Sequence, residues 1–136
     1  MIAVTWRSAH ALEVLAELAR ADEGELIPIG EIVRRRGLRE STMASITPLL
    51  RKSGLISARR GVSGGFCLAR PASAITVAQV VAAIDGAVGA DCEGVFADAA
   101  EAIRDALAGC TLLEYAENER RDALTHPEHS PHMYYI

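Results

Sequence analysis

The sequence predicts a mostly α-helical protein with one small β-hairpin and a long helix in its C-terminal part. Aromatic residues make up only 4% of the chain, whereas alanine is abundant. Apolar residues recur at three- and four-residue steps in most segments, and one glycine-rich loop separates two short β-type runs. Half of the 136 residues are apolar and 24% are charged, which is enough to bury a core without disulfides or metals.

Two short helices are predicted at the beginning of the chain. The first covers residues 8–20, where Ser8 can cap the N-terminus and leucines and alanines repeat at helical spacing. The second begins at Ile29, after a short loop, and ends at Gly37, directly after three arginines. Glycine is favoured at helix C-termini, and positive charge is stabilising there because the helix dipole is negative at that end.

A third helix is predicted from Ser41, or just before it, to Gly54. Its apolar side chains also repeat at helical steps, and we expect Pro48 to bend it because proline removes one backbone donor. Three short helices joined by tight turns are the organisation of a helix-turn-helix unit.

A β-hairpin is predicted next. Residues 55–60 and 66–69 form its two short strands, and the loop between them, residues 61–65, contains three glycines. Arg59 and Arg60 stand directly before the glycine-rich tip. A helix-turn-helix unit followed by such a basic hairpin predicts a winged helix.

The C-terminal half is predicted to be helical, with a helix over residues 75–84 that Thr76 caps. After a glycine-rich linker, residues 86–94, a longer helix covers Val95–Ala108 and another covers residues 112–124. The longer helix carries an apolar seam outside the N-terminal unit, and a second copy of the chain is the economical partner for it. This seam consists of Phe96, Ala99, Ile103, Ala106, Leu107 and Cys110.

The predicted elements divide the chain into three parts. Residues 1–85 form a winged helix-turn-helix domain, residues 86–124 form the linker and dimerisation helices, and residues 125–136 form a flexible tail. No apolar stretch approaches the roughly 20 residues that span a bilayer, and the N-terminus lacks the apolar segment of a signal peptide. Because three cysteines are an odd number, we expect no disulfide framework and a reducing, cytoplasmic location without membrane contact.

The formal net charge of −4 is distributed unevenly. Residues 34–70 contain nine basic side chains and one acidic one, whereas the segments on either side are acidic. A basic region between acidic flanks indicates a local surface for a polyanion. The side chains expected to neutralise phosphates without reading the base sequence are Arg34, Arg35, Arg36, Arg39, Arg51 and Lys52.

The winged helix also predicts where the base sequence of double-stranded DNA would be read. Ser41, Thr42 and Ser45, short polar side chains in the N-terminal half of the third helix, can reach base edges in the major groove. Arg59 and Arg60 beside the wing tip can enter the minor groove, where the negative potential is deepest.

The region around the wing resembles a known family. Residues 49–56 (LLRKSGLI) and 60–71 (RGVSGGFCLARP) are similar to the signature of the Rrf-two family of bacterial winged-helix transcriptional regulators. Residues 74–85 resemble the segment that follows this signature, and the resemblance extends in order over residues 5–124. It implies a homodimer that pairs through the long C-terminal helix and binds a palindromic operator.

The resemblance also assigns roles to individual residues. It implies minor-groove contact by Arg60 and adds Arg39 and Ala44 to the base-reading set. Thr42 stands where the family often has an aromatic residue and Ala44 where it often has a polar one, so the operator sequence of relatives does not carry over. The complete set of candidate DNA-binding residues is Arg39, Ser41, Thr42, Ala44, Ser45, Arg51, Arg59, Arg60, Ser63, Gly64 and Gly65.

The resemblance raises the possibility of an iron–sulfur cluster, because some members of the family bind one. Cluster-binding members carry three cysteines a few residues apart before the long helix, whereas here Cys92 matches the first and the next cysteine is Cys110. A helix of about 14 residues between them would separate the two by ~21 Å, too far for one cluster, so we expect no metal or cofactor. The alternative, an arrangement like that of some relatives, combines these cysteines with His10 or Glu13 from the first helix of a second copy.

The other polar candidates have simpler interpretations. Cys110 lies on the apolar seam and is expected to be a small buried side chain. Cys67 in the wing strand leaves a redox-active thiol open as an alternative. His10 is expected on a helix surface or at an interface, and Glu13 and Glu17 in a solvent-exposed stripe.

The C-terminal tail contains three regularly spaced histidines, His126, His129 and His132. Pro127 and Pro131 interrupt any helix that would bring them to one face, so a solvated segment is favoured over a metal site. We therefore expect no metal site in this segment.

These observations together predict a dimeric winged-helix transcriptional regulator, a repressor in the first hypothesis, that binds operator DNA. Two alternatives stay open: an iron–sulfur or thiol-based redox sensor of the same family, and a winged-helix protein-interaction module that does not depend on DNA. An enzyme is not expected, because the sequence contains no P-loop, no dinucleotide fingerprint and no Ser/His/Asp set.

Overall fold

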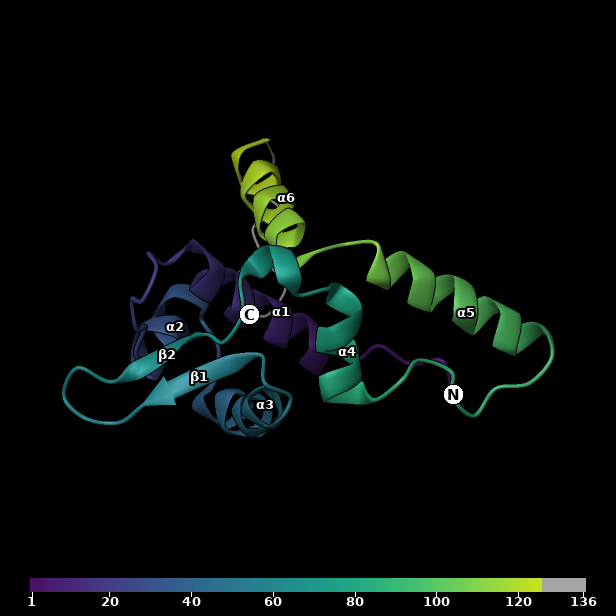
Figure 1. Ribbon diagram of the computed structural model, residues 1–136, viewed down its shortest axis with the longest axis horizontal. Coiled ribbons are helices and arrows are strands. Elements are labelled where there is room, and N and C mark those ends of the chain that lie inside the picture. The colour runs from purple at the N-terminus through teal and green to yellow at the C-terminus, as the bar shows by residue number, and fades with distance from the viewer. Residues whose placement is uncertain (126–136) are drawn as a thin grey trace.

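The computed structural model describes residues 1–125 and confirms the predicted fold class, mostly helical with a small β-hairpin wing (Figure 1). The elements are α1 (Trp6–Arg20), α2 (Ile29–Arg36), α3 (Glu40–Lys52), β1 (Ile56–Arg59), β2 (Gly65–Leu68), the 3-10 turn η1 (Ala72–Ala74), α4 (Val77–Asp85), α5 (Val95–Ala108) and α6 (Leu112–Thr125). Among the described residues, none of the helices has the length and apolar character that crossing a membrane requires.

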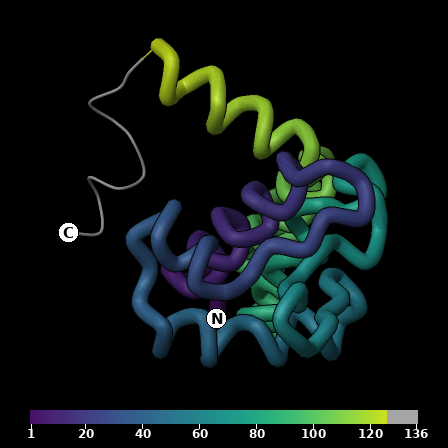
Figure 2. Tube along the Cα trace, turned by 90° about the vertical axis from the view of Figure 1, so that its left-hand side faces the viewer, coloured from purple at the N-terminus to yellow at the C-terminus, as the bar shows by residue number. Residues whose placement is uncertain are grey.

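The predicted tail falls largely outside this description. Of residues 125–136, Thr125 ends α6. The three histidines of that segment lie outside the described residues, so the expectation that they are solvated stays a prediction. In Figure 2 the first turns of α6 lie against the body of the molecule and its far end projects away from it. The burial of Leu112 at one end and the exposure of Leu124 at the other agree with this arrangement.

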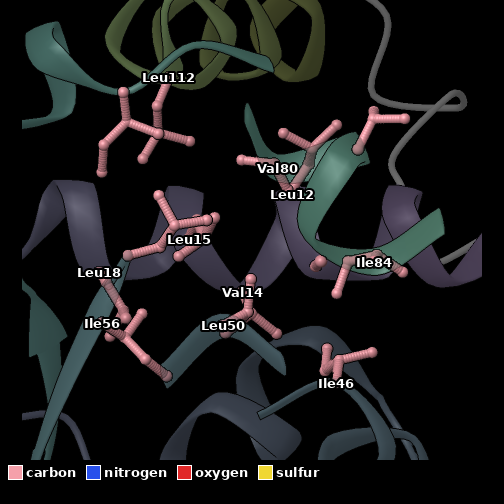
Figure 3. Packing of buried hydrophobic residues seen from close by; sticks show 14 of the residues in the cluster. Leu12, Val14, Leu15, Leu18, Ile46, Leu50, Ile56, Val80, Ile84 and Leu112 are labelled. Carbon is pink, nitrogen blue, oxygen red and sulfur yellow. The ribbon is translucent and has the colours of Figure 1, made fainter. Parts of the chain in front are cut away.

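The core is organised around α1. Its leucine and valine side chains face those of α3 on one side, and those of α4 and α6 on the others (Figure 3). Leu15, Ile46, Leu50, Val80 and Leu112 are fully buried. Burial of each such side chain stabilises the fold by roughly 1.5–3 kcal/mol, and it is this packing that holds helices too short to be stable alone.

Two helix ends follow the local sequence rules and one does not. Gly37 ends α2 with a φ of 62°, and Thr76 caps α4 in a reciprocal capping box with Gln79. The prediction that Ser8 caps the first helix is wrong, because α1 begins two residues earlier. Ser8 is buried inside α1, and its hydroxyl donates to Asp85 at 2.6 Å.

Asp85, the last residue of α4, holds the beginning of α1. It accepts from the backbone N–H of Thr5 at 2.8 Å, from the Thr5 hydroxyl at 2.7 Å and from Ser8. Burial raises the pKa of the Asp85 carboxyl, but these bonds and the nearby positive charge of Arg7 lower the pKa by more, so its net direction is downward. The carboxylate therefore stays charged and ties the two helices together.

α5 extends from one end of the molecule, and the wing lies at the opposite end (Figure 1). Two residues of α5 contact the preceding linker. The buried Ala100 leaves no room for a side chain at Gly89, and Arg104 donates to the Val88 carbonyl at 2.5 Å. The inner side of α5 is therefore fastened to its own protomer.

One part of the predicted apolar seam of α5 packs against the core of the same chain, and another part is exposed. Ile103, Leu107 and Cys110 pack against the core of the same chain, which corrects the expectation that the whole seam awaits a second copy. Phe96 remains 66% exposed and its neighbour Val95 72% exposed. Only the outer part of α5 is therefore left without an apolar partner within residues 1–125.

Candidate nucleic-acid interface

α3 presents the base-reading candidates on its outer face. Ser41, Ala44 and Ser45 are exposed and Thr42 is partly exposed. Between them, the helical period turns inward the side chains that fix α3 to the core: Met43, Ile46 and Leu50. The helix continues through Pro48, and the bend expected there stays a prediction. A rigid helix with small polar side chains outward matches the shape that enters a major groove.

Arg39 and Arg51 lie near the two ends of α3. Arg39 is the exposed N-cap residue, although its side chain makes no capping hydrogen bond, and Arg51 is exposed in the last turn.

A hollow of about 200 Å³ lies beside Arg39, between the start of α1 and the start of α3. It is lined by Trp6, His10, Gly37, Leu38, Arg39 and Thr42.

The wing is a two-stranded antiparallel hairpin in which Arg59 pairs with Gly65. Arg59, Arg60 and Ser63 are exposed around its tip, and Gly64 donates to the Gly61 carbonyl at 3.0 Å to close the loop. The wing therefore carries two cationic side chains on a narrow, exposed support.

The structure explains why position 65 is a glycine, which the sequence pattern did not show. Its φ is 156°, and a Cβ there would lie 2.6 Å from the Ile27 carbonyl oxygen. The backbone of Ile27 exchanges hydrogen bonds of 2.9 Å with Phe66, as a one-residue continuation of the hairpin. Glycine at this position lets the hairpin lie close to the loop before α2, and it thereby sets the direction of the wing.

The prediction that Arg36 neutralises phosphate is wrong. Its side chain is 4% exposed and lies in an ion cluster that joins α1, α2 and α6. Arg36 donates to Glu17 at 2.7 Å and to both carboxylate oxygens of Glu119 at 2.7 and 2.9 Å. Arg20 completes the cluster, with a bond of 2.9 Å to Glu119. Arg35 reaches the same cluster at its edge, 3.5 Å from Glu17. Because Arg36 is buried and bonded to both acids, it is not available to DNA.

The other two members of the arginine run are exposed but paired. Arg34 and Arg35 donate to Glu31 at 2.5 and 2.8 Å. Their hydrogen bonds, that of Arg34 first, lower the pKa of the Glu31 carboxyl. Part of the positive charge that the sequence places before α3 is therefore compensated within α2.

Three predictions for α1 are also corrected. Glu13 and Glu17 are buried rather than in an exposed stripe. His10 is buried too, with its Nδ1 atom 3.6 Å from Glu13 and its ring 5.4 Å, edge to face, from that of Trp6. Burial lowers the pKa of His10, so its imidazole is neutral at neutral pH. These side chains belong to the interior that α1 organises.

Arg7 is a residue of this surface that the sequence reasoning missed. It lies in the first turn of α1, and its Nη2 atom donates to Ser45 Oγ at 2.7 Å. Arg7 and Arg20 are the only basic residues among the first 33. The sequence did mark Arg7 as an isolated arginine in an acidic segment. No neighbouring residue in the sequence indicated that its side chain reaches α3.

The described cysteines do not fit an iron–sulfur cluster within one protomer. Cys92 and Cys110 flank the 14-residue α5, which at 1.5 Å per residue is ~21 Å long. Burial and the negative charge of Glu114 raise the pKa of the Cys110 thiol, which disfavours the thiolate that a cluster needs. Within residues 1–125, no group of three or more metal-binding side chains comes together.

Two further observations concern the ligands considered for such a cluster. His10 and Glu13 are 8% and 3% exposed, so neither side chain presents a free surface on its own protomer. Cys67 lies in β2, is partly exposed and, like the other two cysteines, is free.

Comparison with known proteins agrees with this geometry. The profile of the Rrf2 family, described as an iron-dependent transcriptional regulator, matches residues 4–109. The HTH-type transcriptional regulator IscR of Escherichia coli K12 is 34% identical over 92 residues, which are 67% of this chain and 57% of IscR. The chain thus matches little more than half the length of this curated relative. These relatives are regulators rather than enzymes.

Solved structures show the same fold. CymR, the global cysteine regulator of B. subtilis, superposes with a TM-score of 0.76 at 22% identity and covers 87% of this chain and 98% of its own. IscR of T. potens superposes with a TM-score of 0.73 at 24% identity and covers 85% and 87%. At these identities the likeness establishes the winged-helix fold.

Proposed function

Because the chain belongs to the Rrf2 family of transcriptional regulators, we propose that it is a homodimeric repressor of transcription that binds a palindromic DNA operator. The observation that carries the proposal is that α3 and the wing, which follow one another in the chain, both expose their candidate DNA-contacting side chains. Ser41, Thr42, Ala44 and Ser45 lie outward on α3, and Arg60 lies outward on the wing that follows it.

These two features suit the two grooves of DNA. A helix with short polar side chains reads base edges in the major groove, and a wing arginine reaches the minor groove beside it. Arg39 and Arg51 at the ends of α3 would contact phosphates. Arg59, Ser63, Gly64 and Gly65 complete the proposed contact set in the wing. The buried Arg36 is left out of it.

The proposed dimer uses the outer face of α5. Val95 and Phe96 are large, apolar and exposed there, whereas the inner face of α5 is fastened to its own protomer. Exposed apolar side chains that lie together on a projecting helix are typical of a protein–protein interface. Two-fold pairing of α5 would carry two winged helices, and this symmetry matches the proposed palindrome.

DNA binding is tested by the salt dependence of complex formation. Operator duplexes are selected from a randomised pool, and the dissociation constant is measured by fluorescence anisotropy at several salt concentrations. We expect affinity to fall steeply and linearly on logarithmic axes, because cations that contact phosphates release counterions. A protein-interaction module would select no duplex and show no such slope, and that result would contradict the proposal.

Two variants separate anchoring from reading. Arg60→Ala is expected to weaken binding to every selected operator by roughly five- to tenfold, the effect of losing about 1 kcal/mol or slightly more. Ser41→Ala is expected to change the preferred base at particular positions, because its hydroxyl contacts a base edge. Both side chains are exposed, so thermal melting should be unchanged. An Arg60→Ala protein with unaltered affinity at physiological salt would refute the wing assignment.

A second candidate function is an iron-dependent one, which the description of the family profile favours. The arrangement of cysteines within one protomer speaks against it, and we expect a protein purified without oxygen to be colourless and free of iron. Visible absorption and an iron assay measure this. A brown protein with stoichiometric iron would instead require Cys92 and Cys110 to come together with residues of a second copy.

A further inference from the structure

The base-reading side chain Ser45 is already hydrogen-bonded to a cation of the same chain. The Nη2 atom of Arg7 donates to Ser45 Oγ at 2.7 Å and lies 3.5 Å from the Ser45 carbonyl oxygen. Arg7 belongs to α1 and Ser45 to the exposed face of α3. The contact therefore joins a residue outside the helix-turn-helix motif to the surface proposed to face DNA.

The surroundings of Arg7 include a buried nitrogen atom and a nearby carboxylate. Its Nε atom is buried, and no hydrogen-bond partner reaches it in the described part of the chain. The carboxylate of Asp85, whose pKa the charge of Arg7 lowers, is fixed beside the start of α1 by Thr5 and Ser8. Arg7 therefore has a buried Nε atom and the negative charge of Asp85 in its surroundings, while its terminal nitrogen contacts Ser45.

This contact decides which hydrogen-bonding role Ser45 can play. A serine hydroxyl can donate once and accept, whereas a guanidinium can only donate. Ser45 must therefore accept from Arg7, and its own hydrogen remains for an outside partner. The adjacent positive charge also disfavours a second donor, such as an amino group, at the same oxygen.

We propose that Arg7 is a specificity-determining residue that makes Ser45 a hydrogen-bond donor toward DNA. The base that faces Ser45 would then be one with an acceptor on its major-groove edge. Guanine has N7 and O6, adenine N7 and thymine O4, whereas cytosine presents an amino donor. Cytosine is therefore the base disfavoured at this position. The proposal rests on the proposed operator binding and adds the chemistry of one reading position to it.

The test is base selection by matched variants. The wild-type protein, Ser45→Ala and Arg7→Met are each used to select duplexes from the same randomised pool. Arg7→Met keeps an unbranched apolar stem and removes the guanidinium. The operator position whose preference Ser45→Ala alters is the position that Ser45 reads. Dissociation constants are then measured for the four bases at that position.

The wild-type protein is expected to bind the cytosine operator roughly five- to tenfold more weakly than the best operator, the equivalent of about one hydrogen bond. Arg7→Met should reduce this difference to about twofold, because the Ser45 hydroxyl is then free either to donate or to accept. Adding Ser45→Ala to Arg7→Met should then change the base preference little. Unchanged preferences at the other positions show that the variant still folds and docks.

Arg51→Met is the matched control, because it removes an exposed arginine from α3, the helix that carries Ser45. It should weaken binding to all sequences alike and leave the discrimination against cytosine intact. The proposal is overturned if the wild type prefers cytosine at the Ser45 position, or if Arg7→Met behaves as Arg51→Met does. It is also overturned if Ser45→Ala alters no position. A wild-type protein that enriches no sequence at all would instead overturn the proposed DNA binding itself.

Discussion

Replacing Arg36 with alanine is expected to lower the free energy of unfolding by about 3 kcal/mol. Glu17 and Glu119 then lose their most buried cation and keep only the more exposed Arg20 and Arg35. Arg36 bonds to Glu17 and to both oxygens of Glu119 and is almost completely buried. A loss of that size is a large fraction of the stability of a domain this small. Urea denaturation followed by circular dichroism measures it.

Arg34→Ala is the control for this prediction. It removes an arginine from the same helix whose partner, Glu31, is three residues away and whose side chain is 71% exposed. We expect a much smaller loss, because exposed ion pairs contribute little. Arg36→Met combined with Glu17→Gln and Glu119→Gln should recover much of the stability, since no buried charge is then left alone. Equal losses for Arg34→Ala and Arg36→Ala would contradict the ion cluster.

Replacing Phe96 with aspartate is expected to convert the proposed dimer into a monomer and to weaken operator binding on the order of a hundredfold. Two linked reading heads bind a palindrome with avidity, and a monomer loses the second head. Phe96 is 66% exposed in the protomer, so the substitution costs the single chain little stability. Analytical ultracentrifugation gives the oligomeric state, and fluorescence anisotropy gives the affinity for the selected operator.

Ser73→Asp in the exposed turn η1 adds the same negative charge at a different place. It should leave both the dimer and the affinity unchanged, which separates a broken interface from general repulsion of DNA. If Phe96→Asp remains dimeric and binds the palindrome as tightly as the wild type, the outer face of α5 is not the interface.

The ion cluster and the Asp85 contacts connect the elements around α3, the proposed reading helix. Arg36 is the last residue of α2, one turn of chain before α3, and it ties α2 to Glu119 of α6. At the other side, Asp85 ties α4 to the start of α1, from which Arg7 reaches Ser45. The C-terminal helices are thereby linked to the proposed DNA-binding surface through charged contacts as well as through the apolar core.

The order and types of the helices and of the hairpin could be predicted because local patterns specify them, whereas most bounds differ by one or two residues and the turn η1 was missed. Helical spacing of apolar residues, the glycine after the three arginines and the capping residue Thr76 each act over a few positions. Val95–Ala108 was predicted with the bounds that the structure has. The winged-helix region was predictable for the same reason, since the turn, α3 and the glycine-tipped hairpin follow one another directly in the chain.

The roles of the charged residues were decided only by tertiary structure. Arg36 and Arg60 look alike in the basic segment, yet Arg36 meets Glu119, 83 positions away, whereas Arg60 is exposed in the wing. Arg7 finds Ser45 across 38 positions, and the seam of α5 divides between its own core and the outside. A local pattern determines which way a side chain faces along its own helix or strand. Which neighbour it then meets depends on how separate elements pack, and no short stretch of sequence contains that information.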